Sequence, residues 1–274
     1  MGFFSNIRNL LPSRASLFGL PERTGPFTPT YDDVRHARAL LKALKLPTEL
    51  VLEILEYAKY WPAQKFKYRP NHPIVTSALG GNPSAATICL EANIFSNPTL
   101  DEIRQGRERP KIRSLEFDFV SHDQGWTSEN TQGTYSTSSW LELSILRPVS
   151  NTNSHLPKPR LVNRWDGSPL DFHTNMSARG WSLVKRPESA LQGPQEGEGD
   201  FAWYLQGNRV AVGSKKYHVK WSEQGCEGNE GAGKGEGFLQ ALQDGDRILV
   251  WARAKWHGWQ CIVESVNVTV RYGV

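Results

Sequence analysis

The hydrophobic period of this chain changes near residue 86, and that change restricts its fold more than any other feature. Beyond it, apolar side chains alternate with polar ones, as where Glu116 and Asp118 separate Leu115, Phe117 and Phe119. Alternation of this kind predicts a β-strand with one buried face. The pattern predicts strands over residues 88–94, 115–119, 141–145, 210–212, 217–221, 248–252 and 262–272. Several strands joined by loops rich in Gly, Ser and Asn are typical of an antiparallel sandwich or barrel.

Before the change, apolar residues recur at helical spacing. Thr30 and Asp33 have the spacing of an N-cap with a reciprocal acidic partner, which predicts a helix start. A second helix is predicted to begin at Pro47, because proline is tolerated in a first turn, and to end at Pro62. The predicted fold class is therefore α+β by segregation, with a small N-terminal helical module followed by a mainly antiparallel β-sandwich.

Composition along the chain predicts its domain organisation. Two inserts within the sandwich are rich in Gly and Glu and almost free of apolar side chains, so they cannot offset the entropy cost of ordering and are predicted to be mobile. The predicted parts are a mobile basic segment over 1–29, a helical module over 30–63, a linker over 64–85, and a β-sandwich over 86–274 with flexible inserts at 186–200 and 222–237.

Charge and hydropathy exclude several classes of protein. The net charge is only +4, and the basic excess lies before the sandwich rather than in a stripe on it, which argues against nucleic-acid binding. No apolar run is long enough for a transmembrane segment. The three Cys are odd in number and lack a CxxC pattern, which favours a reducing compartment. We expect a cytoplasmic protein, with a nuclear location as an alternative, while the basic N-terminal helix leaves mitochondrial or membrane-surface targeting open.

One strand carries two carboxylates on the same face, Glu116 and Asp118. The spacing resembles the Glu-x-Asp-x-x-Glu signature of jelly-roll glycoside hydrolases that retain configuration, but the last position is Ser121. The second carboxylate that such an enzyme needs is therefore missing, and only an accident of register would let Glu142 replace it. The simpler interpretation is a solvated sheet face. His and Cys residues form no recognisable ligand pattern, so we expect no metal and no cofactor.

The tryptophans are the most distinctive side chains of the sandwich. Nine of the ten lie between Trp126 and Trp259. Those predicted within strands are expected in the core, namely Trp140, Trp221 and Trp251. A loop indole can offer a flat apolar face to a ligand while nearby polar groups fix its orientation, although capping of the core is the plainer alternative. The indoles predicted in loops are Trp126, Trp165, Trp181, Trp256 and Trp259.

The start of the second helix resembles the opening of an F-box, LPxEL followed by IL. In that family these helices dock a substrate receptor onto a ubiquitin-ligase adaptor through an apolar face. The resemblance implies that the adaptor contacts are made by Leu46, Pro47, Leu50, Ile54 and Leu55. Residues 64–85 have no match to the later F-box helices.

The last two predicted strands resemble those of galactose-binding-like sandwiches, which include the F-box-associated domain of sugar-recognising F-box proteins and the phloem-lectin domain. The shared features are a Trp-x-Gly turn over residues 256–258 and a closing strand that reads Ser-Val-x-Val over 265–268. Residues 122–126 (HDQGW) are similar to a stretch of uncharacterised fungal proteins of this layout.

Together these features predict a non-enzymatic recognition protein. Its helices bind a protein partner, and its sandwich presents loops to a glycan or glycoprotein. The predicted stacking surfaces are Trp126, Trp256 and Trp259, with polar partners His122, Asp123, Gln124 and His257. One alternative is a carbohydrate-active enzyme of jelly-roll type using Glu116 and Asp118. Another is a scaffold with no small-molecule ligand.

Overall fold

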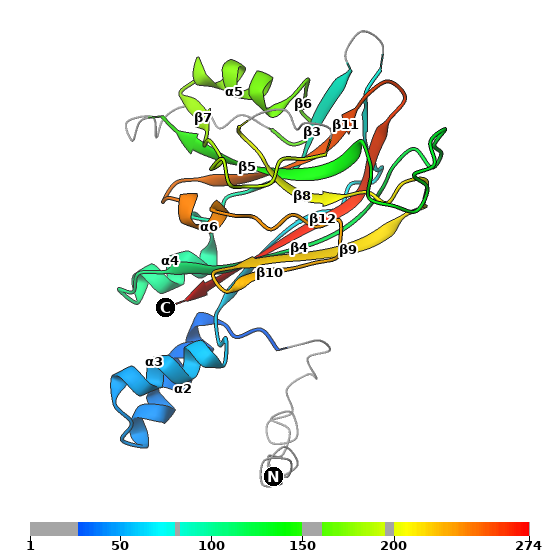
Figure 1. Ribbon diagram of the computed structural model, residues 1–274. Coiled ribbons are helices and arrows are strands. Elements are labelled where there is room, and N and C mark those ends of the chain that lie inside the picture. The colour runs from blue at the N-terminus through cyan, green and yellow to red at the C-terminus, as the bar shows by residue number, and fades with distance from the viewer. Residues whose placement is uncertain (1–26, 80–82, 150–160, 195–199, 274) are drawn as a thin grey trace, which may run out of the picture.

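The computed structural model describes residues 27–79, 83–149, 161–194 and 200–273. Two six-stranded antiparallel sheets pack face to face, and a pair of helices lies at one end of the sandwich (Figure 1). The predicted fold class, α+β with a mainly β-sandwich body, is confirmed.

The first sheet, sheet A, is organised around a long strand near the C-terminus. Its strand order is β1-β12-β4-β9-β10, and β2 also pairs with β12. The strands of sheet A are β1 (Ala63–Tyr68), β2 (Ile74–Ser77), β4 (Lys111–His122), β9 (Lys215–Ser222), β10 (Gly225–Glu227) and β12 (Gln260–Gly273).

The second sheet, sheet B, has the order β6-β3-β11-β5-β7, and β8 also pairs with β5. Its two central pairings join β11 to β3 and to β5 over nearly the full length of each strand. The strands of sheet B are β3 (Ser84–Ala92), β5 (Ser139–Pro148), β6 (Trp165–Asp166), β7 (Trp181–Leu183), β8 (Trp203–Gly207) and β11 (Arg247–Lys255).

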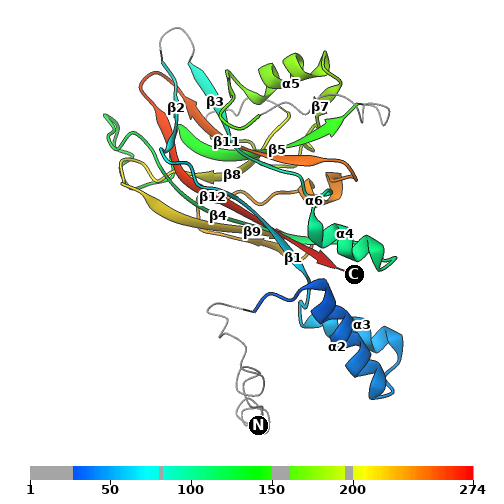
Figure 2. The ribbon, with the colours of Figure 1, turned by 180° about the vertical axis from the view of Figure 1, so that it is seen from behind.

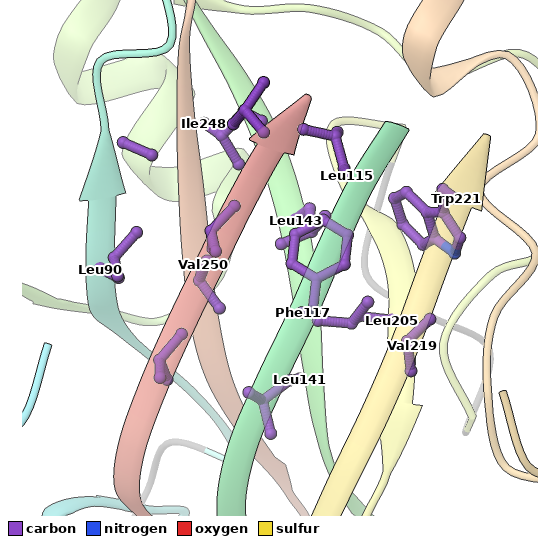
Figure 3. Close-up of a cluster of buried hydrophobic side chains, with 14 of the residues drawn as sticks. Leu90, Leu115, Phe117, Leu141, Leu143, Leu205, Val219, Trp221, Ile248 and Val250 are labelled. Carbon is purple, nitrogen blue, oxygen red and sulfur yellow. The ribbon is translucent and has the colours of Figure 1, made fainter. Parts of the chain in front are cut away.

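The main core fills the space between the sheets. Most of the alternating side chains predicted to face inward do so, as Leu115 and Phe117 meet Leu143 and Val250 across the sandwich (Figure 3). Ile88 instead packs on the outer face of sheet B, and Ile262 is only partly buried. The core tryptophans Trp140, Trp221 and Trp251 are all buried, as predicted. Burying a large apolar side chain stabilises the fold by roughly 1.5–3 kcal/mol, so this layer dominates the stability of the sandwich.

Sheet B is buried on its outer face as well. There α5 (Pro169–Ser177) covers Ile88, Leu249 and Trp251, and Phe172 meets the Trp251 ring edge-on at 5.1 Å. The same face holds a buried ion pair, in which Arg253 Nη1 donates to Glu142 Oε1 at 2.8 Å. Strands buried on both faces explain why β3, β5 and β11 are apolar along most of their length.

The helical module consists of α2 (Tyr31–Ala43) and α3 (Thr48–Tyr57). The predicted capping box is present, since Thr30 Oγ1 accepts from Asp33 N and Asp33 Oδ2 accepts from Thr30 N. The pair has a small core of its own, made by Val34, Val51 and Leu55.

The module is attached to the sandwich beside α4 (Pro98–Gln105), as Figure 2 shows. Just beyond that helix, Glu108 accepts from Tyr31 Oη at 3.0 Å and from Arg38 Nη1 at 2.5 Å. A second ion pair joins Glu56 of α3 to Arg113 of β4 at 3.2 Å. Two partly shielded charge pairs and the buried Tyr31 ring thus fix the helices to one end of the body.

The prediction of a linker over residues 64–85 is wrong. That segment contains β1 and β2, which both pair with the same edge of β12. The loop between them carries Pro70 and Pro73. Proline cannot donate to a ladder and therefore belongs at sheet edges, so a proline-rich stretch at the edge of a sheet resembles a linker in sequence.

The predicted mobility of the insert at 222–237 is also contradicted. Residues 231–236 lie over Trp203, Tyr204 and Trp221, and Trp221 Nε1 donates to Gly233 O at 2.8 Å. At its far end the insert leads into the short helix α6 (Phe238–Ala241). Glycine has no side chain of its own to bury, but here it permits close approach to indole rings that supply the apolar surface.

The first insert, 186–200, is described in part, because residues 195–199 lie outside the described ranges. Its beginning is packed on the body, since Arg186 is buried and Ala190 belongs to the main core. The strand predicted at 210–212 is a turn, and β8 precedes it at Trp203–Gly207. The prediction for residues 1–29 falls outside the described residues as far as residue 26, and Phe27 stacks on Tyr60 at 5.8 Å.

Candidate functional site

A small pocket lies at the end of the sandwich opposite the helical module, where β4 and β11 end. It has a volume of about 100 Å³ and lies between the loop after β4 and the turn that joins β11 to β12. The lining residues are Gln124, Trp126, Thr127, Ser128, Glu129, His257, Gly258 and Trp259. Four of the seven ligand-binding residues predicted from sequence meet here.

The β11–β12 turn is held in shape by its backbone. Trp256 and Gly258 both have positive φ angles, 70° and 88°. Only glycine adopts such angles without strain, so Trp256 is constrained by its surroundings. The backbone of Ala78 holds the turn through two hydrogen bonds. Its N donates to Trp259 O at 3.0 Å, and its O accepts from Gly258 N at 3.1 Å. The pocket wall carrying His257 and Trp259 is therefore a fixed surface.

The opposite wall is held by Asp123, the first residue after β4. Its buried carboxylate accepts from Gly125 N at 2.8 Å and from Ala211 N at 2.7 Å. Gln124 then joins the two walls, since its Oε1 accepts from Gln260 N at 3.2 Å and its Nε2 donates to Trp126 O at 2.7 Å.

Behind this wall lies a buried polar cluster that fixes the loop after β8. Asn208 contacts Ser121 Oγ at 2.6 Å and Ser139 Oγ at 2.7 Å, linking the ends of both sheets. Arg209 N donates to Tyr217 Oη at 3.0 Å. Burial raises the pKa of Tyr217 to about 12, so its hydroxyl stays protonated at neutral pH. The pocket thus lies on a rigid base.

Trp126 is exposed at 61%. A carbon atom added at Gly258 would lie 3.7 Å from Cη2 of Trp126, so the edge of the indole borders the turn. Trp259 lines the same pocket and is only partly exposed. A flat apolar surface next to one imidazole, one carboxylate and several amide and hydroxyl groups suits a ligand with both apolar and polar faces.

Three predicted ligand-binding residues have other positions. Asp123 is buried and holds the loop, so the prediction that it contacts a ligand is contradicted by its geometry. His122 points its Nδ1 at Asp123 O, 2.7 Å away, and its Nε2 lies 3.9 Å from Glu264 Oε1. Trp256 is exposed outside the pocket, with Lys255 Nζ 5.0 Å from its ring centre.

Sequence reasoning missed Thr127, Ser128 and Glu129, which follow Trp126 directly. A stretch of hydroxyl and carboxyl side chains after an exposed indole was the available signal. Of the other loop indoles, Trp165 is exposed at the edge of sheet B, whereas Trp181 lies buried in β7 beneath the Arg247 guanidinium, 4.4 Å away.

The carboxylates considered for an enzyme lie elsewhere, on the outer face of sheet A. Glu116 accepts from Arg271 Nε at 2.8 Å, and Asp118 lies 2.8 Å from His218 Nδ1. Glu142 belongs to sheet B and is buried with Arg253. Across the described ranges, no group of three or more His, Cys, Asp or Glu side chains is placed to hold a metal ion.

The residues implied by the F-box resemblance divide into two sets. Leu50 and Ile54 are exposed at 45% and 42%, and Pro47 is exposed at the start of α3. Leu55 is buried in the core of the helix pair and Leu46 packs against that core. The prediction that Leu55 contacts a partner is therefore wrong, because the helix pair uses it internally.

Comparison with known proteins gives only distant structural matches. No protein-family model matches the chain, and neither does any curated protein. Among solved structures, it is similar to basic winged bean lectin with Tn-antigen, at 8% identity and a TM-score of 0.33, over 77% of this chain and 100% of the lectin. It is also similar to peanut lectin with a 9mer peptide, at 10% identity and a TM-score of 0.30, over 77% and 98% of the two chains. Values this low have no bearing on what this chain binds.

Within the described residues, none of the helices is both long and apolar enough to cross a membrane.

Proposed function

We propose that this protein recognises a carbohydrate, without transforming it, at the pocket formed by Gln124, Trp126, His257 and Trp259. The observation that carries the proposal is the convergence of two indoles from separate loops onto one polar pocket held by a rigid backbone. Sugars have apolar C–H faces and polar rims. An indole offers a flat partner for the first, and amide, imidazole and hydroxyl groups bind the second.

The size of the pocket defines what enters it. A volume of about 100 Å³ admits part of one sugar ring rather than a buried oligosaccharide. The exposed Trp126 indole extends the contact area beyond the cavity. A terminal sugar, with one edge in the pocket and one face on Trp126, fits this arrangement.

The test begins with the full chain on a glycan array, followed by calorimetric titration of the glycans that bind. Trp126→Ala removes the stacking surface and is expected to weaken binding about tenfold, the effect of losing roughly 1.4 kcal/mol. Trp256→Ala is the matched control, because Trp256 is also exposed, at 48%, but lies outside the pocket. Absence of any glycan ligand for the wild type, or equal losses in both variants, refutes the proposal.

We further propose that the helical module binds a protein partner, by the F-box resemblance a ubiquitin-ligase adaptor. The favouring observation is a set of large apolar side chains on the helix pair that are exposed by 42% or more in the described structure. They are Leu40, Leu44, Leu50, Leu52, Ile54 and Tyr57, with Tyr57 exposed at 92%. Exposed apolar side chains grouped on one module are typical of an interaction surface.

Co-purification of the adaptor with the full chain tests this second proposal. Leu50→Asp and Ile54→Asp are expected to abolish recovery of the adaptor without unfolding the module, since both side chains are exposed. Glu53→Lys, on an exposed site of the same helix, is the control for a change of charge. Failure to recover the adaptor with the wild type refutes the proposal, and glycan-array silence together with a stable protein partner supports a scaffold instead.

The absence of catalysis is part of the proposal. It is supported by the contacts that occupy both carboxylates on the outer face of sheet A, since Glu116 is paired with Arg271 and Asp118 is bonded to His218. Hydrolysis of a panel of chromogenic glycosides by the wild type, abolished by Glu116→Gln, is the result that would replace recognition by enzymatic activity.

A further inference from the structure

A second and larger hollow lies on the flank of the sandwich, where the edges of the two sheets face each other. Its volume is about 540 Å³, and β2 and β3 lie side by side along it (Figure 2). The lining side chains used below are Tyr68, His72, Val75, Thr87, Asn163 and Trp165. None of them lines the pocket described above.

The hollow has a fixed floor. Tyr68 Oη, at the end of β1, donates to Asn163 Oδ1 at 3.2 Å and so links the edge of sheet A to the edge of sheet B. The backbone of Asn163 is itself anchored, because its N donates to Ile88 O at 2.8 Å. Asn163 has a φ of 66°, a conformation that asparagine tolerates better than most residues. The amide group of Asn163 is therefore presented in one orientation.

One wall is an indole. Trp165 lies in β6, opposite Thr87 of β3, and its side chain is 53% exposed. It is not stacked on any ring in the part of the chain that the structure describes. A core-capping role would leave the ring covered, whereas here half of it is open to the hollow and to solvent.

The chemistry of the lining narrows the class of ligand. Aromatic, amide, hydroxyl and imidazole groups line the hollow together with prolines and aliphatic side chains, and the lining includes no Asp, Glu, Lys or Arg. A charged ligand would find no counter-ion there. The volume falls within the usual 300–1,000 Å³ of small-molecule sites. A peptide adding as a strand is disfavoured, because Pro70 and Pro73 interrupt the edge formed by β1 and β2.

The hollow and the pocket are joined by one short strand. Val75 of β2 lines the hollow, and Ala78, three residues later, is hydrogen-bonded to Trp259 and Gly258 in the wall of the pocket. Three residues of extended chain span roughly 10 Å. That separation is comparable to the length of a short oligosaccharide, so both sites are within reach of one ligand.

We propose that this hollow is a second binding site, for a neutral oligosaccharide, with Trp165 as its stacking surface and Asn163 as its polar anchor. The inference rests on the proposed function only in taking the ligand to be a sugar. The geometry of the hollow is independent of the first pocket. The inference assigns the longer part of a glycan to the flank of the sandwich.

The test labels the full chain with 5-fluorotryptophan and follows each indole by fluorine NMR. Single Trp substitutions assign the resonances of Trp126, Trp165 and Trp256. The probes are cellotetraose, maltotetraose, chitotetraose, mannotetraose and lacto-N-tetraose, with a sialylated lacto-N-tetraose as the charged counterpart. At least one neutral tetrasaccharide is expected to shift the Trp165 resonance and leave Trp256 unchanged.

Two variants then measure the contribution of the site. Trp165→Ala is expected to weaken binding of that tetrasaccharide at least tenfold, and Asn163→Asp to weaken it at least threefold while keeping the acceptor for Tyr68. Trp256→Ala is expected to leave the affinity unchanged. Circular dichroism checks that each variant is folded.

The outcomes separate the two sites. A shift at Trp165 that persists in Trp126→Ala supports the flank site even where the first pocket fails. A shift at Trp126 alone supports the proposed function and overturns this inference. Unchanged affinity in Trp165→Ala, binding of a proline-rich peptide at Trp165 in place of every sugar, or no binding of any tetrasaccharide also overturns it.

Discussion

Replacing Asp123 by asparagine tests the claim that this carboxylate holds the wall of the first pocket. The side chain is fully buried, and its two oxygens accept one backbone N–H each, from Gly125 and Ala211. Asparagine keeps one acceptor and places an NH₂ group against the other donor. The change therefore removes one charge-assisted hydrogen bond and leaves a partly buried N–H without its acceptor.

The expected loss can be worked from these contacts. A hydrogen bond to a charged group contributes about 1.5–3 kcal/mol, and a buried donor without an acceptor costs about 1–3 kcal/mol. The two contributions describe the same lost hydrogen bond and are therefore not fully additive. We expect the free energy of unfolding to fall by about 3 kcal/mol. In a domain of this size that corresponds to a fall in Tm of roughly 6–12 °C.

Urea denaturation of the full chain measures the effect, with Asp118→Asn as the matched control. Asp118 lies in β4, five residues before Asp123, but its side chain is 53% exposed and its contact with His218 is half exposed too. Such a pair contributes at most about 1 kcal/mol. A loss in Asp123→Asn that is no larger than that of Asp118→Asn would refute the assignment of Asp123 as a structural residue.

Two further predictions concern the packing of the second insert and the buried tyrosines. Gly233→Ala would place a methyl group against the backbone oxygen of Tyr204 and is expected to lower the free energy of unfolding by about 3 kcal/mol. Gly213→Ala is the control, because the added methyl group meets nothing within 4 Å and no change is expected. Urea denaturation measures both variants. Burial raises the pKa of Tyr217 to about 12 from an ordinary value of 10.0, so the unfolded chain loses this proton first and stability should fall as the pH rises from 10 to 12. Absorbance at 295 nm in native and urea-unfolded protein measures the titration of the tyrosines. Tyr217→Phe should lose less stability than the wild type over this pH range. Equal pH dependence of stability in the two proteins would contradict the prediction.

The sequence predicts the centre of the sandwich well and its edges poorly. Strands β4, β5, β11 and β12 have long alternating or apolar stretches because they are flanked by other strands, and the alternation directly reports which face is buried. The edge strand β1 reads Ala-Gln-Lys-Phe-Lys-Tyr, in which only Phe66 and Tyr68 pack against the core. Lysines on the exposed face protect an edge strand from pairing with another chain. They also lower the hydrophobicity of the strand, so that its sequence does not predict a strand.

The sequence pattern does not predict the short helix α5, for a different reason. Ser168 caps α5 through its Oγ, which accepts from Asp171 N, and Pro169 occupies the first turn. That signature is readable, but the nine residues that follow are too few to show a helical period. The helix is stabilised by packing on Trp251, a contact that lies outside its own sequence.

The site was predicted in part for a physical reason as well. Gln124, Trp126 and Trp259 lie directly beyond strand ends, so their gathering at one end of the sandwich follows from topology. The role of Asp123 could not be read in the same way, because its partner Ala211 lies in a turn 88 positions away. The flank hollow depends on Tyr68 of β1 and on Asn163 in the turn before β6, which lie 95 positions apart in the sequence.

Strand β12 has a consequence for how the chain is made. It is the common partner of β1, β2 and β4, and Ala63 pairs with Arg271, roughly 200 residues further along the chain. Until β12 is made, β1 and β2 have no strand to pair with in sheet A, and β4 has only β9. We therefore expect this half of the sandwich to assemble late in translation, with the nascent chain relying on chaperones until β12 emerges.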